Sequence, residues 1–237
     1  MSSDSLSRML ERTLELVDGL RESEQLATPR PPLRPQEVVA RLDLEPPLEA
    51  LDENELWRRV AEVVEMTPKT SSRRFFNALF AGREAAAVSG ELLAALLNNS
   101  MYTYKMAGVQ ILVEQSLTRR MAALGGYPEG EGLGVPGGSI GNLVALVVAR
   151  GEASPELRES GHDGRRFRVY VSEEGHYSVR KNAGVLGIGR ANVRSIAVDE
   201  RGRMRPEELE RALVEDREAG LVPLCVVATA GTTVRGV

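Results

Sequence analysis

The chain has 237 residues, of which 42% are hydrophobic and 27% are charged, a composition typical of soluble globular proteins. Its formal net charge of −4 gives no electrostatic reason to expect nucleic acid or an anionic membrane as a partner. The single cysteine, Cys225, excludes a disulfide within the chain and favours a reducing, cytoplasmic compartment, and no apolar run is long enough to span a membrane.

Residues 1–70 are predicted to form a helical arm that contains an extended linker. The first helix is predicted near the N-terminus, because apolar side chains recur there at helical spacing and the acids among them exclude a signal peptide. The four prolines of residues 27–35 block helix and central strand, which predicts the linker. A second helix is predicted over residues 52–66, because Asp52 and Glu55 have the spacing of a capping box.

Residues 71–237 are predicted to form an α/β domain. A loop over residues 71–83 is followed by two helices, 85–97 and 106–124, whose apolar content predicts that they are largely buried. Strands and helices then alternate, and the predicted elements are strand 167–172, helix 176–186, strand 193–198, helix 206–219 and strand 221–229. Because the strands are apolar and β-branched and are joined through helices, we expect a mostly parallel sheet with flanking helices.

The segment PGGSIGN, residues 136–142, has the composition of a phosphate-binding turn. Gly137 and Gly138 permit a tight turn and a close approach of the backbone, and Ser139 opens an apolar helix. The unpaired N–H groups at such a helix start, together with the positive end of the helix dipole, attract phosphate. The alternative is an ordinary loop in which Ser139 caps the helix, which is the commoner use of Gly-Gly-Ser.

Two further segments place polar groups just after predicted strands. His176 follows the first strand at the entry to a helix, where an imidazole can stack on an aromatic cofactor ring; the alternative is a histidine that faces solvent. Thr233 follows the last strand in the segment ATAGTTVRGV, where its hydroxyl is available to a ligand. The alternative is that the threonines belong to the strand and Gly231 begins a turn. Ligands of open α/β sheets collect beyond the carboxyl ends of the strands, so both residues are candidates for one site.

These segments resemble those of the group II pyridoxal-phosphate-dependent decarboxylases, which act on glutamate, aspartate, cysteine sulfinate or aromatic amino acids. The resemblance runs from about residue 74 to residue 237 and includes H-Y-S at residues 176–178, the K-x-A-G-x-L-G-I-G pattern after it and F-F-N at residues 75–77. It implies a fold-type-I large domain, of which this chain holds the first part, and pyridoxal 5′-phosphate as the cofactor. It also implies an amino acid substrate and a homodimer, and we expect no nucleic acid, membrane or metal site.

The resemblance implies a role for each candidate residue near the cofactor. Gly138 and Ser139 would hold the phosphate. His176 would stack on the pyridoxal ring as the catalytic residue, and Thr233 would lie beside the cofactor. The chain departs from the family pattern at Gly141, where the family usually has serine, so a side-chain contact to the phosphate is not expected there.

Three residues are expected near the substrate on the same grounds: Phe76, Asn77 and Tyr104. For the aromatic rings, packing in the core is an equal alternative. The family commonly has glutamine at the position of Ala78. The alanine removes two hydrogen-bond donors and an acceptor, which leaves the substrate preference open.

The Schiff-base lysine of the family, and its aspartate for the pyridine nitrogen, are expected beyond residue 237. The three lysines of the chain, Lys69, Lys105 and Lys181, have none of the sequence context of that lysine and are predicted to be solvated charges. We therefore expect residues 1–237 to be part of a decarboxylase and to be inactive alone. Two alternatives are another fold-type-I enzyme, such as an aminotransferase or a desulfurase-like lyase, and a catalytically inactive truncated partner; the pattern after H-Y-S favours the decarboxylases.

Overall fold

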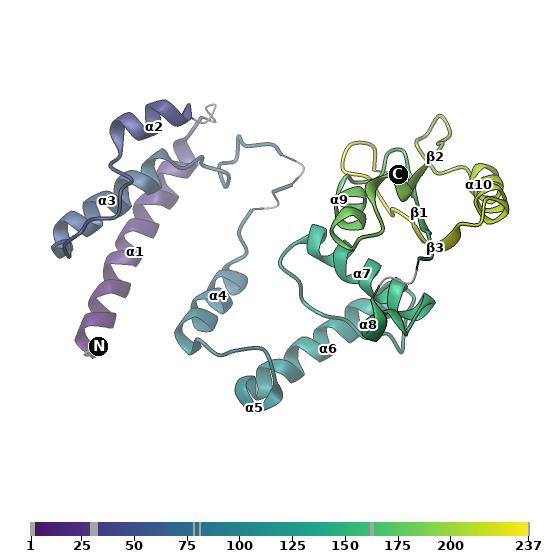
Figure 1. Ribbon diagram of the computed structural model, residues 1–237. Helices are drawn as coiled ribbons and strands as arrows, with labels where there is room; N and C mark the ends of the chain where they lie inside the picture. Colours follow the sequence, from purple (N-terminus) through teal and green to yellow (C-terminus); the bar gives the residue numbers. More distant parts are fainter. Residues whose placement is uncertain (1–2, 29–32, 78, 81, 162–163, 237) are drawn as a thin grey trace. The chain divides into compact units, whose positions relative to one another are not determined.

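The computed structural model (Figure 1) describes most of the chain, namely residues 3–28, 33–77, 79–80, 82–161 and 164–236. The chain divides into two compact units, Met1–Asn98, which is helical, and Asn99–Val237, which holds a sheet. The predicted boundary at residue 70, between the helical arm and the α/β domain, stays a prediction. Within the described ranges, no helix combines the length and the apolar character needed to cross a lipid bilayer.

The described part of the first unit contains four helices: α1 (Ser3–Leu26), α2 (Pro35–Arg41), α3 (Glu53–Met66) and α4 (Ala85–Leu97). Asp52 caps α3 as predicted, because its carboxylate accepts hydrogen bonds from the amides of Asn54 and Glu55 at 2.9 and 3.0 Å. The carboxylate of Glu55 pairs with Arg58 and Arg59 rather than with the Asp52 amide, and these hydrogen bonds lower its pKa to about 2. The expected capping box is therefore only half formed.

Helix α2 follows the proline-rich segment and has no predicted counterpart. Pro35, the last proline of the predicted linker, is the first residue of the helix, a position at which a missing amide proton costs nothing. The carboxylate of Glu37 accepts a hydrogen bond from the amide of Arg34 at 2.9 Å and stabilises the helix start. The predicted linker therefore ends before residue 35.

The second unit carries the predicted parallel sheet. Its described strands are β1 (Phe167–Ser172), β2 (Val193–Ile196) and β3 (Val222–Val227), in the order β2–β1–β3. Val169 of β1 lies opposite Val193 and Cys225, which sets the register of both pairs. The helical elements are α5 (Tyr104–Ala107), α6 (Val109–Leu124), α7 (Gly138–Ala153), α8 (Leu157–Ser160), α9 (Ser178–Val185), the 3-10 turn η1 (Arg190–Asn192) and α10 (Pro206–Glu218).

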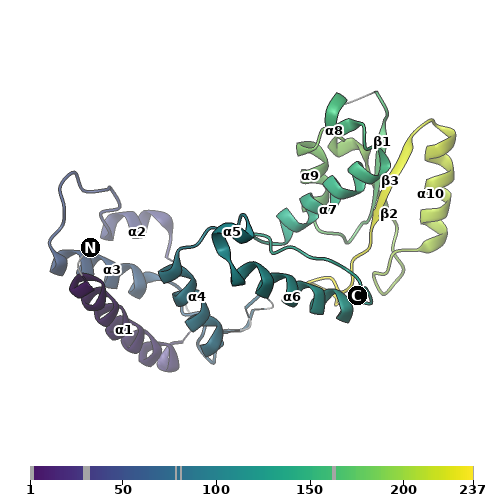
Figure 2. The ribbon, with the colours of Figure 1, turned by 90° about the horizontal axis from the view of Figure 1, so that it is seen from below.

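Helices cover both faces of the sheet (Figure 2). On one face, Leu146 of α7 and Val179 of α9 belong to the same buried cluster as Val169. On the other face, Ala212 of α10 packs with Tyr170. Successive side chains of a strand point to opposite faces, so Val169 and Tyr170 serve the two clusters, and both are fully buried. This burial from both sides accounts for the apolar run Val169–Val171 within β1.

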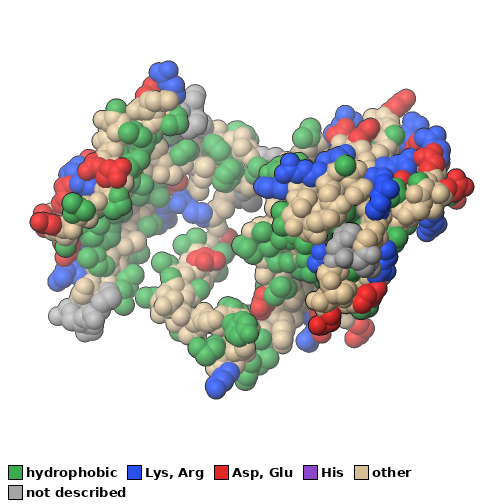
Figure 3. Space-filling model, viewed as in Figure 1, with side chains coloured by type: hydrophobic (Ala, Val, Ile, Leu, Met, Phe, Trp, Pro, Cys, Tyr) green, Lys and Arg blue, Asp and Glu red, His purple; other side chains and the backbone are tan. Residues whose placement is uncertain are grey.

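The two helices that are predicted to be largely buried, 85–97 and 106–124, are exposed within the chain. Gly108, with φ +56°, divides the second of them into α5 and α6. On α6, Leu117 and Met121 are 59% and 61% exposed, and hydrophobic side chains of this kind lie at the surface of both units (Figure 3). The prediction of burial is wrong for this chain, because apolar content shows that a helix has a face to bury but not what buries it.

Candidate active site

The loops after β1 and β3 bring two candidate residues to one edge of the sheet. The two strands are parallel neighbours, so their carboxyl ends lie side by side. The first loop carries His176 and the second carries Thr233. An ion pair of 3.2 Å between Glu174 and Arg235 joins the two loops. The tertiary structure therefore brings His176 and Thr233 to the same edge, as the sequence predicts.

The segment around Gly137 forms an open turn at the start of α7. Gly137 has φ +94°, a conformation that favours glycine, and its carbonyl accepts from the amides of Ile140 and Gly141. Among the described residues, no atom accepts a hydrogen bond from the amides of Gly138 or Ser139. A Cβ at Gly138 would meet no atom within 4 Å. Two amides without an acceptor among the described residues, at the positive end of a helix, fit a phosphate.

Two hydrogen bonds join the start of α7 to α9. The side-chain amide of Asn182 donates to the carbonyl oxygen of Ser139 at 2.8 Å. The side-chain amide of Asn142 donates to the hydroxyl of Ser178 at 2.9 Å. Asn182 and Ser178 are buried, so neither bond competes freely with water. These bonds position the turn at Gly137 against the helix that begins just after His176.

His176 is held through one ring nitrogen. Its Nδ1 lies 2.8 Å from the hydroxyl of Ser178 and 3.2 Å from the Ser178 amide. A backbone amide can only donate, so Nδ1 is the acceptor and the neutral ring carries its proton on Nε2. The side chain is exposed and lies next to Tyr177, with ring centroids 4.3 Å apart. His176 precedes α9 instead of beginning it, and an imidazole fixed at one nitrogen with an exposed face can stack on a planar ligand.

Thr233 lies in a turn after the end of β3. Gly231, with φ +89°, redirects the chain there. The hydroxyl of Thr232 accepts from the amide of Arg235 at 3.2 Å, whereas the hydroxyl of Thr233 is exposed and has no hydrogen bond to a described residue. Of the two threonines, Thr233 is therefore the one whose hydroxyl has no hydrogen bond to a described residue.

The predicted substrate residues are divided between the two units. Phe76 is 91% exposed, and the side chain of Asn77 accepts from the Leu79 amide at 2.8 Å; both belong to the first unit. Tyr104 is the first residue of α5 in the second unit and is 61% exposed. Packing in a core, the alternative for these rings, does not occur in the described chain. Their role near a substrate stays a prediction, and Ala78 lies outside the described residues.

Asn142, Ser178 and Asn182 lie in the segments that carry the candidate residues, but no function is predicted for them from the sequence. Their signal is only the presence of asparagine and serine near helix starts, which is too common to be specific. At Gly141, an added Cβ would lie 3.4 Å from Cγ2 of Val135. Val135 thus occupies the space next to Gly141, where the family usually has serine.

Comparisons with known proteins show which family this chain resembles in sequence and in fold. Residues 35–237 match the family model of the pyridoxal-dependent decarboxylase conserved domain. The cysteine sulfinic acid decarboxylase of Mus musculus is 39% identical over 203 residues, which are 85% of this chain and 41% of that protein. The acidic amino acid decarboxylase GADL1 of Bos taurus is 39% identical over 203 residues, 85% of this chain and 39% of that protein.

Among solved structures, the crystal structure of mouse CSAD has a TM-score of 0.93 to this chain at 34% sequence identity. The match covers 100% of this chain and 50% of that one. The chain therefore spans about half the length of that structure, and 41% of the curated mouse relative. With a family model matched over most of its residues, the chain belongs to the pyridoxal-dependent decarboxylase family.

Proposed function

We propose that this chain supplies the cofactor-binding part of a pyridoxal-phosphate-dependent amino acid decarboxylase. The observation that carries the proposal is the connection between the open start of α7 and the imidazole of His176, which Asn142 and Ser178 hold in one hydrogen-bonded assembly. A ligand with a phosphate at one end and an aromatic ring at the other matches two such contacts, and pyridoxal 5′-phosphate has this form. The family to which the chain belongs supports the same cofactor.

Each candidate residue then has a defined part. The amides of Gly138 and Ser139 bind the phosphate, and the exposed face of His176 stacks on the ring. Thr233 offers its hydroxyl from the neighbouring loop. When bound, the cofactor supplies an electron sink for the electron pair that a departing carboxylate leaves behind.

The hydrogen bonds of His176 determine what its imidazole can do in this site. Ser178 occupies Nδ1, so the proton on Nε2 is available for a hydrogen bond to a carboxylate or to another acceptor of the substrate. The same hydrogen bonds restrict rotation of the imidazole about its side-chain bonds. The ring plane therefore keeps one orientation. His176 therefore orients the reactants and holds a proton at Nε2.

For the substrate we propose an acidic amino acid. The names of the two relatives, cysteine sulfinic acid decarboxylase and acidic amino acid decarboxylase, support this class. Phe76, Asn77 and Tyr104 are proposed to lie near the substrate. A homodimer and a cytoplasmic location belong to the same proposal; the single cysteine supports the location.

The proposal is tested with the protein expressed from the complete reading frame. With pyridoxal 5′-phosphate and cysteine sulfinate, aspartate or glutamate, it should release carbon dioxide and the corresponding amine, and tryptophan serves as the control substrate. Release of a keto acid without carbon dioxide would contradict decarboxylation and favour an aminotransferase. If only tryptophan released carbon dioxide, the proposed decarboxylation would stand, but the proposed acidic substrate would be wrong.

A further inference from the structure

The loop that leads into the phosphate turn lies along one side of helix α6. An added Cβ at three of its glycines would lie within about 3 Å of a side chain of α6: Gly130 of Ala122, Gly132 of Thr118 and Gly134 of Glu114, and Gly130 would also meet Tyr127 of the loop. The glycines are spaced by two residues and their partners by four, in the opposite direction along the chain. Residues 130–135 contain no turn or bend. The loop is therefore a straight segment that follows one row of the helix.

The spacing of these contacts has a simple geometric cause. Two residues of extended chain span about 6.6 Å, and four residues of helix rise about 6.0 Å, so the two rows stay in step. A side chain would push the loop away from the helix. At Gly132, for example, an added Cβ would lie 2.7 Å from Cβ of Thr118, closer than two carbon atoms approach without a shift. The alternating glycines allow the backbone of the loop to lie directly on α6.

Glu114 adds a hydrogen bond to this contact. Its Oε1 accepts from the amide of Gly134 at 2.8 Å. Glu114 and Thr118 are half-buried, whereas Leu112 and Val113 of the same helix are 50% and 61% exposed. Two of the three residues of α6 that face the loop are therefore polar, and the amide of Gly134 gives the carboxylate of Glu114 a specific partner.

The position of Gly134 is transmitted to the phosphate turn through Val135. The carbonyl of Val135 accepts from the amide of Gly137 at 2.8 Å, and its side chain lies against Gly141 in the first turn of α7. We propose that Glu114 is a positioning residue for the phosphate turn: it holds Gly134, and through Val135 it determines where Gly137 redirects the chain. This inference rests on the proposed function, in which that turn binds the cofactor phosphate.

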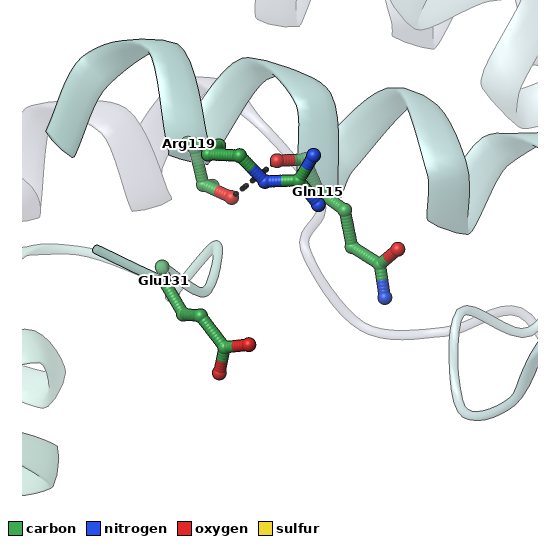
Figure 4. Close-up of a pocket in the computed structure, with 5 residues that line it drawn as sticks. Gln115, Arg119 and Glu131 are labelled. Carbon is green, nitrogen blue, oxygen red and sulfur yellow. Dashed lines mark hydrogen bonds between the residues drawn. The ribbon is translucent and has the colours of Figure 1, made fainter. Parts of the chain in front are cut away.

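A cavity next to the contact makes this hydrogen bond important. Its volume is about 210 Å³, and its lining residues are Gln115, Thr118, Arg119, Glu131 and Gly132. Gln115 and Arg119 project from the helix and Glu131 from the loop (Figure 4). The loop and the helix touch at Gly132 and Thr118 but leave this cavity beside the contact, so the hydrogen bond at Gly134 helps to hold the loop on α6.

Two substitutions at residue 114 separate the hydrogen bond from the charge. Glu114→Gln keeps an oxygen at the same reach, whereas Glu114→Asp keeps the charge but is one methylene too short. We expect Glu114→Asp to weaken binding of pyridoxal 5′-phosphate by about fivefold, the loss of one hydrogen bond, and to leave binding of pyridoxal, which has no phosphate, within about twofold. Amide hydrogen exchange of residues 134–141 should become faster by a similar factor. Glu114→Gln should match the wild type in every measurement.

The controls keep the inference separate from the proposed function. Glu129→Asp changes an exposed glutamate of the same loop and should have no effect, while Gly132→Ala displaces the loop by another route and should reproduce the pattern of Glu114→Asp. Equal phosphate-dependent binding and equal hydrogen exchange in Glu114→Asp and the wild type would overturn the role of Glu114, as would a loss in Glu114→Gln as large as in Glu114→Asp. If the wild type bound no cofactor, the proposed function would fail, and hydrogen exchange of the unliganded protein would still decide whether Glu114 holds the turn.

Discussion

The side-chain amide of Asn142 donates a hydrogen bond of 2.9 Å to the hydroxyl of Ser178. Asn142 lies in the first turns of α7 and Ser178 begins α9, and the same hydroxyl contacts Nδ1 of His176. One serine therefore connects the helix that starts at the phosphate turn with the imidazole that would stack on the cofactor ring. The two ends of the proposed cofactor site are positioned by a single buried group.

Replacing Ser178 by alanine should loosen both ends of this connection. The amide of Asn142 would lose its partner, at a cost of about 1–3 kcal/mol in the free energy of unfolding, and Nδ1 of His176 would keep only the backbone amide. Chemical denaturation and ¹⁵N NMR of the imidazole measure the two effects; the wild type should show the proton on Nε2. Ser116→Ala, at an exposed serine of α6, is the control. Unchanged stability together with an unchanged tautomer population would show that the connection is not maintained in solution.

Gly138→Val tests the phosphate turn. A Cβ at this residue meets no protein atom within 4 Å, so the fold should tolerate it, while the side chain should occupy the space of the phosphate. Affinity for pyridoxal 5′-phosphate should fall by at least about tenfold, or about 1.4 kcal/mol. The measurement is a spectroscopic titration with thermal unfolding alongside. Gly90→Val, at a glycine of α4 whose added Cβ also meets no atom within 4 Å, is the control for backbone effects; a normal titration of Gly138→Val would refute the assignment.

His176→Ala tests the stacking role. The ring is exposed, so its removal should leave thermal stability nearly unchanged. Turnover should fall by about a hundredfold, because the orientation of the reacting groups is lost. Tyr177→Phe, which keeps the neighbouring ring, is the matched control in steady-state kinetics. If His176→Ala retained wild-type turnover, His176 would be a solvent-facing histidine without a part in the reaction.

The lysines of residues 1–237 are expected not to bond to the cofactor aldehyde. Nζ of Lys69 donates to the Val64 carbonyl at 2.6 Å at the end of α3, and Nζ of Lys181 lies 5.9 Å from the ring centroid of Tyr177. Incubation of residues 1–237 with pyridoxal 5′-phosphate, reduction with borohydride and mass spectrometry should reveal no stoichiometrically labelled lysine and no decarboxylase activity. Lys181 lies nearest to His176 in sequence, so Lys181→Met is the informative variant. A label on Lys181 accompanied by carbon dioxide release would overturn the expectation that these residues are inactive alone.

Tyr170 should make stability depend on alkaline pH. Burial, and then the neighbouring carboxylate of Asp216, raise the pKa of Tyr170 to about 12. The native state therefore favours the protonated phenol. The resulting stability is fully present below the ordinary tyrosine pKa of about 10 and is lost as the pH rises through about 12. Tyr170→Phe should remove this part of the pH dependence, as measured by the difference between the two denaturation curves from pH 9 to 12. Parallel curves for the two proteins would contradict the raised pKa.

Elements with local signals could be predicted from the sequence. Helix 85–97 and strand 167–172 agree with α4 and β1 to the residue, because hydrophobic periodicity reports the backbone conformation of a single segment. The same holds for the cap at Asp52, whose acceptor and donors are at most three residues apart. The segments that carry Gly138, His176 and Thr233 could also be chosen from the sequence, because strand ends and helix starts are local features.

The tertiary structure alone decided which side chains position these candidates. Asn142 and Ser178 are 36 residues apart, Asn182 and Ser139 are 43 apart, and Glu114 and Gly134 are 20 apart. A hydrogen bond between such residues depends on how whole elements pack, and no periodicity within one element encodes its partner. The exposure of α6 has the same cause, since its sequence shows that it carries apolar side chains but the path of the neighbouring chain determines which of them are covered.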